Sequence, residues 1–298
     1  MKAIACLGCV LILGMPVDSS WAMTQDPELV LSWGEPGEAP GQFSSPRHIE
    51  MDASGFVYVL DSGRVDRFDE DGKFVSRLSA SGSFFQVIDT GWTYFLTGTV
   101  VVVYDPAGLQ KASWDARHNV YIEVSSLDDF AVDDFGNCFM ITRNPFLGFK
   151  MLKYAPDGRL LKTWTSGAAP WDGVETGKDG FLYTNIGNSV DRRTLEGSLV
   201  QRVFLAPPRY PKIQDVDSQG NFYSSDGKTI TKYGPSGAIL AEWDSPGGTE
   251  YPILSVASWD GRVVYVLDKG ARKVFKYRFS TVASEATSWS SLKKKFRD

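Results

Sequence analysis

Three carboxylates stand at the same position of a pattern that repeats along the chain. Glu50, Glu175 and Asp215 each lie five residues before a glycine in a polar turn. The other copies of the pattern hold Gln86, Ala131 and Val256 at this position. If the strands that carry these residues surround one axis, the carboxylates converge and can bind Ca²⁺ or Mg²⁺ through oxygen ligands. The alternative is a set of polar side chains that face a wet channel.

Histidine offers a second kind of metal chemistry. The chain contains only 2 histidines, His48 and His118, which is too few for a zinc site built mainly from imidazole. The two imidazoles with a carboxylate such as Asp129 would still make a three-ligand site. Two unrelated histidines on the rim of the fold are the simpler interpretation.

A third set of residues combines arginine and histidine with aromatic side chains, in loops that we expect on one face. Aromatic and arginine side chains are enriched where proteins contact their partners. We therefore expect this loop face to bind a protein, a peptide or a glycan. The candidate binding residues are Arg47, His48, Arg117, His118, Arg143, Trp171 and Tyr210.

The repeats themselves predict the fold. The segment Ser45–Asp61 recurs as Tyr210–Asp226, and four weaker copies can be aligned with it. Their turn glycines are spaced 36, 45, 44, 40 and 41 residues apart, which is typical of a propeller blade of four strands. These glycines are Gly55, Gly91, Gly136, Gly180, Gly220 and Gly261.

Each copy divides into four short strands, and the fourth ends on a large apolar residue that we expect to pack between blades. These residues are Leu78, Trp114, Trp164, Phe204 and Trp243. The last copy lacks a fourth strand, whereas Leu29–Trp33 resembles the fourth strand Leu160–Trp164. The sequence thus predicts an all-β, six-bladed β-propeller, closed by an N-terminal strand at about residues 29–33. That strand should pair with the third strand of the last blade, about Val274–Tyr277.

The first copy resembles an NHL repeat. Its sequence is WGEPGEAPGQFSSPRHIEMDASGFVYVLD over Trp33–Asp61, followed by VDRFDEDGKF over Val65–Phe74. The resemblance covers about residues 28–279; it is close in the first copy, good in the fifth and skeletal in the second. It implies a six-bladed propeller of the secreted, bacterial type. Similar proteins include protein- and RNA-binding scaffolds and metal-dependent lyases or hydrolases, so the resemblance leaves the function open.

The ends of the chain differ from the repeats in composition. Residues 1–22 combine a basic start, an apolar run and a final small-x-small pattern, which predicts a signal peptide. We expect the propeller over residues 23–280 and a basic tail over residues 281–298. The mature protein should be exported to the periplasm or the cell exterior, with Cys138 as its single, buried cysteine. No other stretch is apolar for long enough to span a membrane.

Composition limits the possible partners. The 298-residue chain has a net charge of −5, and an acidic chain is a poor binder of nucleic acid. We expect a monomer, and the sequence contains no recognisable catalytic motif. The favoured function is a binding scaffold that needs no cofactor and holds its ligand on the loop face. The alternative is a metal-dependent lyase or hydrolase, in which a divalent cation in the central channel acts as a Lewis acid.

Overall fold

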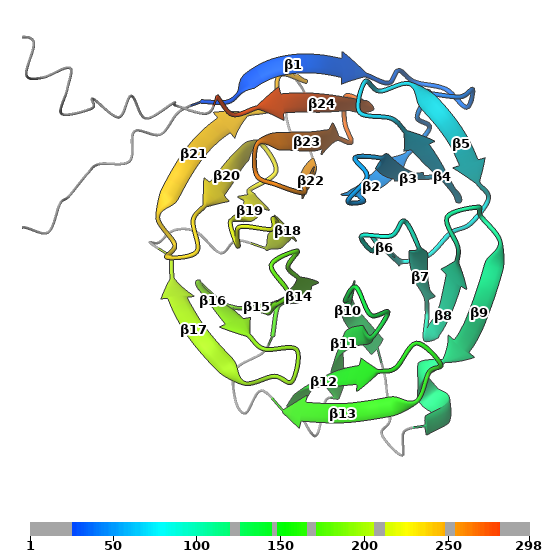
Figure 1. Cartoon of the computed structure of the whole chain (residues 1–298), viewed down its shortest axis with the longest axis vertical. Coiled ribbons are helices and arrows are strands. Elements are labelled where there is room, and N and C mark those ends of the chain that lie inside the picture. The colour runs from blue at the N-terminus through cyan, green and yellow to red at the C-terminus, as the bar shows by residue number, and fades with distance from the viewer. Residues whose placement is uncertain are drawn as a thin grey trace, which may run out of the picture.

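The computed structural model describes residues 26–119, 126–144, 148–165, 171–205, 212–247 and 254–280. Its strands form six antiparallel sheets of four strands each, arranged in a ring around a central axis (Figure 1). Within the described ranges the only helix is a short 3₁₀ helix, Ala116–Asn119. The protein is a six-bladed β-propeller. The predicted fold class is therefore confirmed.

The first strand of every blade lies nearest the axis, and the fourth lies on the outside (Figure 1). Blade 1 comprises β2 (Pro46–Met51), β3 (Val57–Asp61), β4 (Arg64–Phe68) and β5 (Phe74–Leu78). Blade 2 comprises β6 (Phe84–Val87), β7 (Thr93–Thr97), β8 (Val100–Tyr104) and β9 (Gln110–Asp115). Blade 3 comprises β10 (Ser126–Val132), β11 (Cys138–Asn144), β12 (Gly148–Tyr154) and β13 (Leu160–Thr165).

The other half of the ring repeats this plan. Blade 4 comprises β14 (Gly173–Thr176), β15 (Leu182–Ile186), β16 (Ser189–Arg193) and β17 (Leu199–Phe204). Blade 5 comprises β18 (Ile213–Val216), β19 (Phe222–Ser225), β20 (Thr229–Tyr233) and β21 (Ile239–Asp244). Blade 6 comprises β22 (Leu254–Ser258), β23 (Val263–Asp268), β24 (Lys273–Arg278) and the N-terminal strand β1 (Glu28–Trp33).

The ring closes through β1, as the sequence predicts. This strand pairs antiparallel with β24, so that Glu28 lies opposite Arg278 and Trp33 lies opposite Val274. The pairing completes blade 6 from both ends of the described chain and covers the edge of β24, which would otherwise be open to association with other strands.

Large residues on the outer strands pack against the neighbouring blade. Trp114 of β9 lies against Gly158 in the turn between β12 and β13, where a Cβ atom would be only 2.6 Å from the indole. Its ring also lies 5.1 Å from the ring of Tyr154 in blade 3. Trp33 contacts Gly72 in the same way, so the outer tryptophans pack between blades as expected.

The prediction for the outer strand of blade 4 was wrong by one residue. Phe204 is 71% exposed, and the inward position belongs to Val203, which is 8% exposed and lies opposite Val190. Trp164 has the equivalent place opposite Met151. Because successive side chains of a strand point to opposite faces, a shift of one residue turned the predicted packing residue outward.

Two smaller expectations can be compared with the structure. Cys138 is a free, fully buried cysteine, as predicted. None of the helices in the described ranges has the length and apolar character that a membrane crossing requires. The predicted leader (1–22) and tail (281–298) lie outside the described residues.

Candidate functional site

The three repeated carboxylates lie on the innermost strands, close enough to influence one another. Glu50 is on β2, Glu175 on β14 and Asp215 on β18, and these strands surround the axis (Figure 1). The charges of Glu50 and Asp215 both act on Glu175. The structure therefore brings together the three residues that the sequence proposed as metal ligands.

A lysine that the sequence analysis missed lies among these carboxylates. Lys178, in the turn after β14, donates a hydrogen bond from Nζ to Oδ1 of Asp215. The pair is secluded from solvent, with side-chain exposures of 10% for Lys178 and 4% for Asp215. Asp215 also accepts hydrogen bonds from the backbone N–H groups of Val216 (2.8 Å) and Ser258 (2.5 Å). Both oxygens of the Asp215 carboxylate are thus engaged within the protein.

The protonation of the cluster follows from this arrangement. Burial raises the pKa of Glu50 well above its usual range, against the opposing effect of the Lys178 charge. Burial and the carboxylates of Glu50 and Asp215 also raise the pKa of Glu175 well above its usual range. Burial opposes the charge of Lys178, but the carboxylates of Asp215 and Glu50 outweigh it and raise the pKa of the ammonium group. The cluster is an ion pair, Lys178 with Asp215, beside two carboxyl groups that favour the neutral form.

This arrangement does not fit a divalent cation. An ammonium group already lies among the proposed ligands, and a cation placed there would be repelled by it. Among the described residues, no three His, Cys, Asp or Glu side chains are grouped so that they could hold a metal ion. Ca²⁺ needs six to eight oxygen ligands, whereas the oxygens of Asp215 already accept hydrogen bonds. We derive no chemical step through a metal at Glu50, Glu175 and Asp215.

His48 connects the carboxylate cluster with the loop face. Its Nε2 lies 2.8 Å from Oε1 of Glu50, and its Nδ1 lies 3.2 Å from Oγ of Ser255. Burial, together with the charges of Lys269 and Lys212, lowers the pKa of His48 to about 4. The imidazole is therefore neutral at pH 7, and both of its nitrogens are engaged by protein groups.

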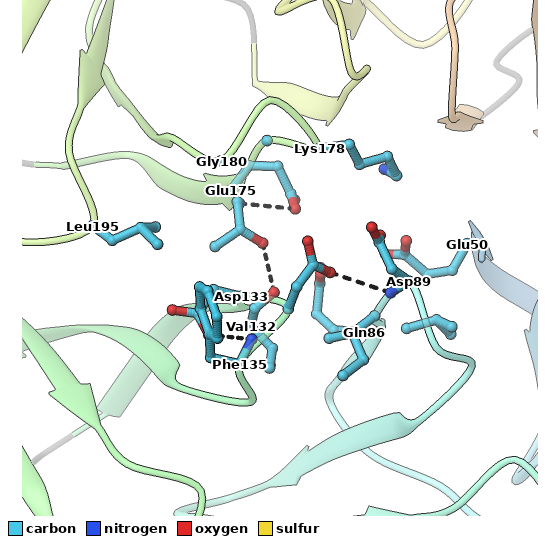
Figure 2. Close-up of a pocket in the computed structure, with 15 residues that line it drawn as sticks. Glu50, Gln86, Asp89, Val132, Asp133, Phe135, Glu175, Lys178, Gly180 and Leu195 are labelled. Carbon is cyan, nitrogen blue, oxygen red and sulfur yellow. Dashed lines mark hydrogen bonds between the residues drawn. The ribbon is translucent and has the colours of Figure 1, made fainter. Parts of the chain in front are cut away.

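The two ends of the channel differ in character. At the end formed by the turns between first and second strands, Glu50, Asp89, Glu175 and Lys178 line a small cavity of about 50 Å³ (Figure 2). Burial and the neighbouring carboxyl group of Asp134 raise the pKa of Asp89 to about 7. This end is acidic and narrow.

The opposite end opens on the loop face into a cavity of about 290 Å³. Every blade contributes at least one residue to its wall. The polar part of the wall includes Arg47, His48, Asp129, Lys212 and Lys269, and the apolar part includes Phe84, Phe85, Phe130, Ile213 and Leu254. Asp129 is buried, accepts a hydrogen bond from the N–H group of Val174 (3.0 Å) and lies 3.7 Å from Nζ of Lys212.

The predicted binding residues separate into different environments. Arg47 and His48 line the loop-face cavity. Arg117 is exposed and paired with Asp115, at 2.7 Å. Arg143 is also exposed; it lies over the ring of Phe149 and is paired with Asp128, at 3.5 Å.

The structure corrects one of the predicted binding residues, and two others lie wholly or partly outside its described part. Trp171 is only 5% exposed and packs in a core cluster with Phe139 and Val174, which corrects the expectation of an accessible ring. Tyr210 and the side chain of His118 lie outside the described part of the chain. The described residues therefore leave untested both the possible zinc site of His48, His118 and Asp129 and the simpler interpretation of two unrelated rim histidines.

Sequence reasoning also missed the lysines of the loop face. Lys212 immediately precedes β18, and Lys269 follows the last residue of β23, so both stand at strand ends on the face where ligands were expected. Their positions were available from the repeat alignment. The alignment could not show that they converge on His48, because they come from blades 5 and 6, far from His48 in the sequence.

Comparisons with known proteins support the fold. No protein-family model and no curated protein matches the sequence. A gluconolactonase from Xanthomonas campestris has a similar structure, with a TM-score of 0.60 and 17% identity over 80% of this chain and 87% of that one. A catalytically inactive virginiamycin B lyase from Staphylococcus aureus, solved with quinupristin, has a TM-score of 0.52 and 15% identity over 79% of this chain and 95% of that one. At these identities the similarity shows the propeller fold alone.

Proposed function

We propose that the protein is an exported binding scaffold that holds a protein, peptide or glycan at the loop-face end of its channel. The observation that carries this proposal is the cavity of about 290 Å³ to which all six blades contribute. Its volume is close to the lower end of the range for small-molecule sites, so it fits one end group of a larger ligand. Apolar walls with a few convergent polar groups are the usual composition of such sites.

Features of His48 favour binding over catalysis. A general base needs a nitrogen that can reach the proton it removes, and its pKa should lie near the working pH. Both ring nitrogens of His48 already contact Glu50 and Ser255, and its pKa lies at about 4. This histidine is therefore suited to shaping the cavity wall.

A blocking variant tests the binding site. Ser83 is exposed and lines the cavity, whereas Ser81 is exposed on the same loop and does not. We expect Ser83→Trp to abolish the binding of ligands found in a thermal-shift screen of short peptides and oligosaccharides, and Ser81→Trp to retain it. Hits that bind Ser83→Trp as well as the wild type would contradict a site in this cavity.

The alternative, a metal-dependent lyase or hydrolase, has its support in the two structural neighbours, which are a lactonase and a lyase. The Lys178 ammonium group counts against a cation in the channel. Elemental analysis of protein purified without chelator separates the two functions. One bound cation per chain, lost in a Glu50→Gln, Glu175→Gln, Asp215→Asn variant that still folds, would overturn the scaffold proposal.

The assignment to a family and the export of the protein are part of the same proposal. The NHL-like sequence of Trp33–Asp61 supports an assignment to the NHL-repeat propellers, and residues 1–22 support export. Mass spectrometry of the mature protein tests the export. A first residue at Met23 is expected, and an intact Met1 or a lipidated Cys9 would refute the proposal.

A further inference from the structure

The loop-face cavity contains three cationic groups, and within the described part of the chain only one of them is paired with an acidic side chain. Arg47, Lys212 and Lys269 reach it from blades 1, 5 and 6. Lys212 lies 3.7 Å from Asp129. Within the described part of the chain, the side chains of Arg47 and Lys269 make no hydrogen bond or ion pair.

The cavity wall carries fewer acidic than cationic side chains, since Asp129 and Glu175 face the three cations there. Burial raises the pKa of Asp129 and, with its carboxylate neighbours, that of Glu175. Burial also lowers the pKa of Lys269, and the charge of Lys212 adds to this effect. A half-buried ammonium group beside a second cation is unfavourable unless an anion approaches it.

The rest of the wall indicates what else the ligand carries. Phe84, Phe130, Ile213 and Leu254 form an apolar lining. The neutral polar side chains are Ser83, Gln86, Gln214 and His48, and both ring nitrogens of His48 are already engaged within the protein. A sugar ring needs many hydrogen-bond partners around its hydroxyl groups, because unpaired buried polar groups are costly. For an apolar side chain next to a carboxylate group, the apolar lining and the cationic side chains of the cavity are sufficient partners. The C-terminal residue of a peptide has this combination.

Resting on the proposed binding function, we propose that the cavity takes the C-terminal residue of a peptide or protein, with its carboxylate at Lys269 and Arg47 and its apolar side chain against the phenylalanine wall. Capture of a chain end is a known mode of peptide recognition. Arginine suits this role because its guanidinium group can bind both carboxylate oxygens.

Calorimetry with paired peptides tests the inference. The probes are N-acetyl-Ala-Ala-X peptides with X as Leu, Phe or Val, each as the free acid and as the C-terminal amide, with glucuronate as an acidic sugar. We expect at least one acid to bind, and its amide to bind at least about tenfold more weakly. Lys269→Met should weaken the acid about fivefold or more, and Lys269→Arg should preserve the preference for the acid.

Lys228→Met is the matched control, because Lys228 is a 68% exposed lysine of blade 5 that pairs with Asp244 outside the cavity. It should leave the affinity unchanged. Equal affinity for acid and amide, or binding to Lys269→Met as tight as to the wild type, would overturn the inference. Binding of glucuronate without binding of any peptide acid would also overturn the inference.

The outcomes separate this inference from the function on which it rests. If no peptide acid binds but another ligand is blocked by Ser83→Trp, the peptide inference fails and the binding site stands. If no ligand of any class is blocked by Ser83→Trp, both fail.

Discussion

The ammonium group of Lys178 donates a hydrogen bond to the carboxylate of Asp215, and the two residues belong to adjacent blades. Lys178 comes from the turn between β14 and β15, whereas Asp215 lies on β18. The ion pair joins blades 4 and 5 beside the axis. Its position also puts a positive charge where the alternative function would place a metal ion.

Replacing this lysine should destabilise the fold strongly. Lys178→Met leaves the buried carboxylate of Asp215 without its cation, and breaking a buried ion pair from one side costs about 3–5 kcal/mol. Urea unfolding of the variant measures the loss. Lys228→Met removes an exposed pair and should cost less than about 1 kcal/mol. Equal losses in the two variants would contradict the structural role of Lys178.

Glu175 should make the protein less stable as the pH rises. Its pKa is raised in the folded state, so the folded protein holds this proton more tightly than the unfolded chain does. The resulting stabilisation is complete below the unfolded pKa of about 4.3 and is lost as the pH rises through the folded pKa. Glutamine has nearly the shape of glutamic acid but stays neutral at every pH. The unfolding free energy of Glu175→Gln, relative to that of the wild type, should therefore increase between pH 5 and 8.

Comparing the two proteins at each pH is essential, because His48 acts in the opposite direction. A constant difference between Glu175→Gln and the wild type over this range would show that Glu175 titrates normally.

The histidine itself can be followed by NMR. We expect the imidazole signal of His48, assigned with a His48→Gln variant, to titrate at about pH 4. The groups that act on it are Glu50 and Ser255 by contact and Lys269, Lys212, Asp129 and Asp215 by charge. Lys269→Met removes one of the charges that lower this pKa, so it should shift the midpoint upward. A wild-type midpoint near 6.5 would contradict the buried environment.

A pair of glycines isolates the packing between blades. Gly158 and Gly55 have φ angles of +82° and +85°, but a Cβ on Gly158 would lie 2.6 Å from Trp114, whereas one on Gly55 would meet nothing within 4 Å. Gly55→Ala should cost about 1–2 kcal/mol from the backbone alone. Gly158→Ala should cost clearly more in the same thermal unfolding experiment. Equal costs would mean that the contact with Trp114 is easily relaxed.

The fold could be predicted because each blade repeats its own local signals. Alternating apolar residues and turn glycines mark the strands in every copy, and the likeness of Leu29–Trp33 to Leu160–Trp164 was sufficient to predict the closure. The error at Phe204 shows the limit of this method. Both Val203 and Phe204 are apolar, so only the pairing with Val190 decides which one faces inward.

The site was harder to predict because it depends on distances between blades. Alignment placed Glu50, Glu175 and Asp215 at one level of the channel, but Lys178 belongs to a turn in which other blades carry Ala53 or Ser218. A turn lysine is normally solvated. Only the three-dimensional arrangement shows that this one reaches inward to Asp215, and that Trp171 is buried in the core.

The closure of the ring has a consequence during synthesis. β1 leaves the ribosome first, but its partner residues end at Arg278, 250 residues after Glu28. At about 5–20 residues per second, the nascent chain carries β1 without its partner for about 12–50 s. During that time the hydrogen-bonding groups of β1 are open to the edge of any other strand, including those of a neighbouring nascent chain. A high local concentration of unfolded chains would therefore favour exchange of β1 between chains.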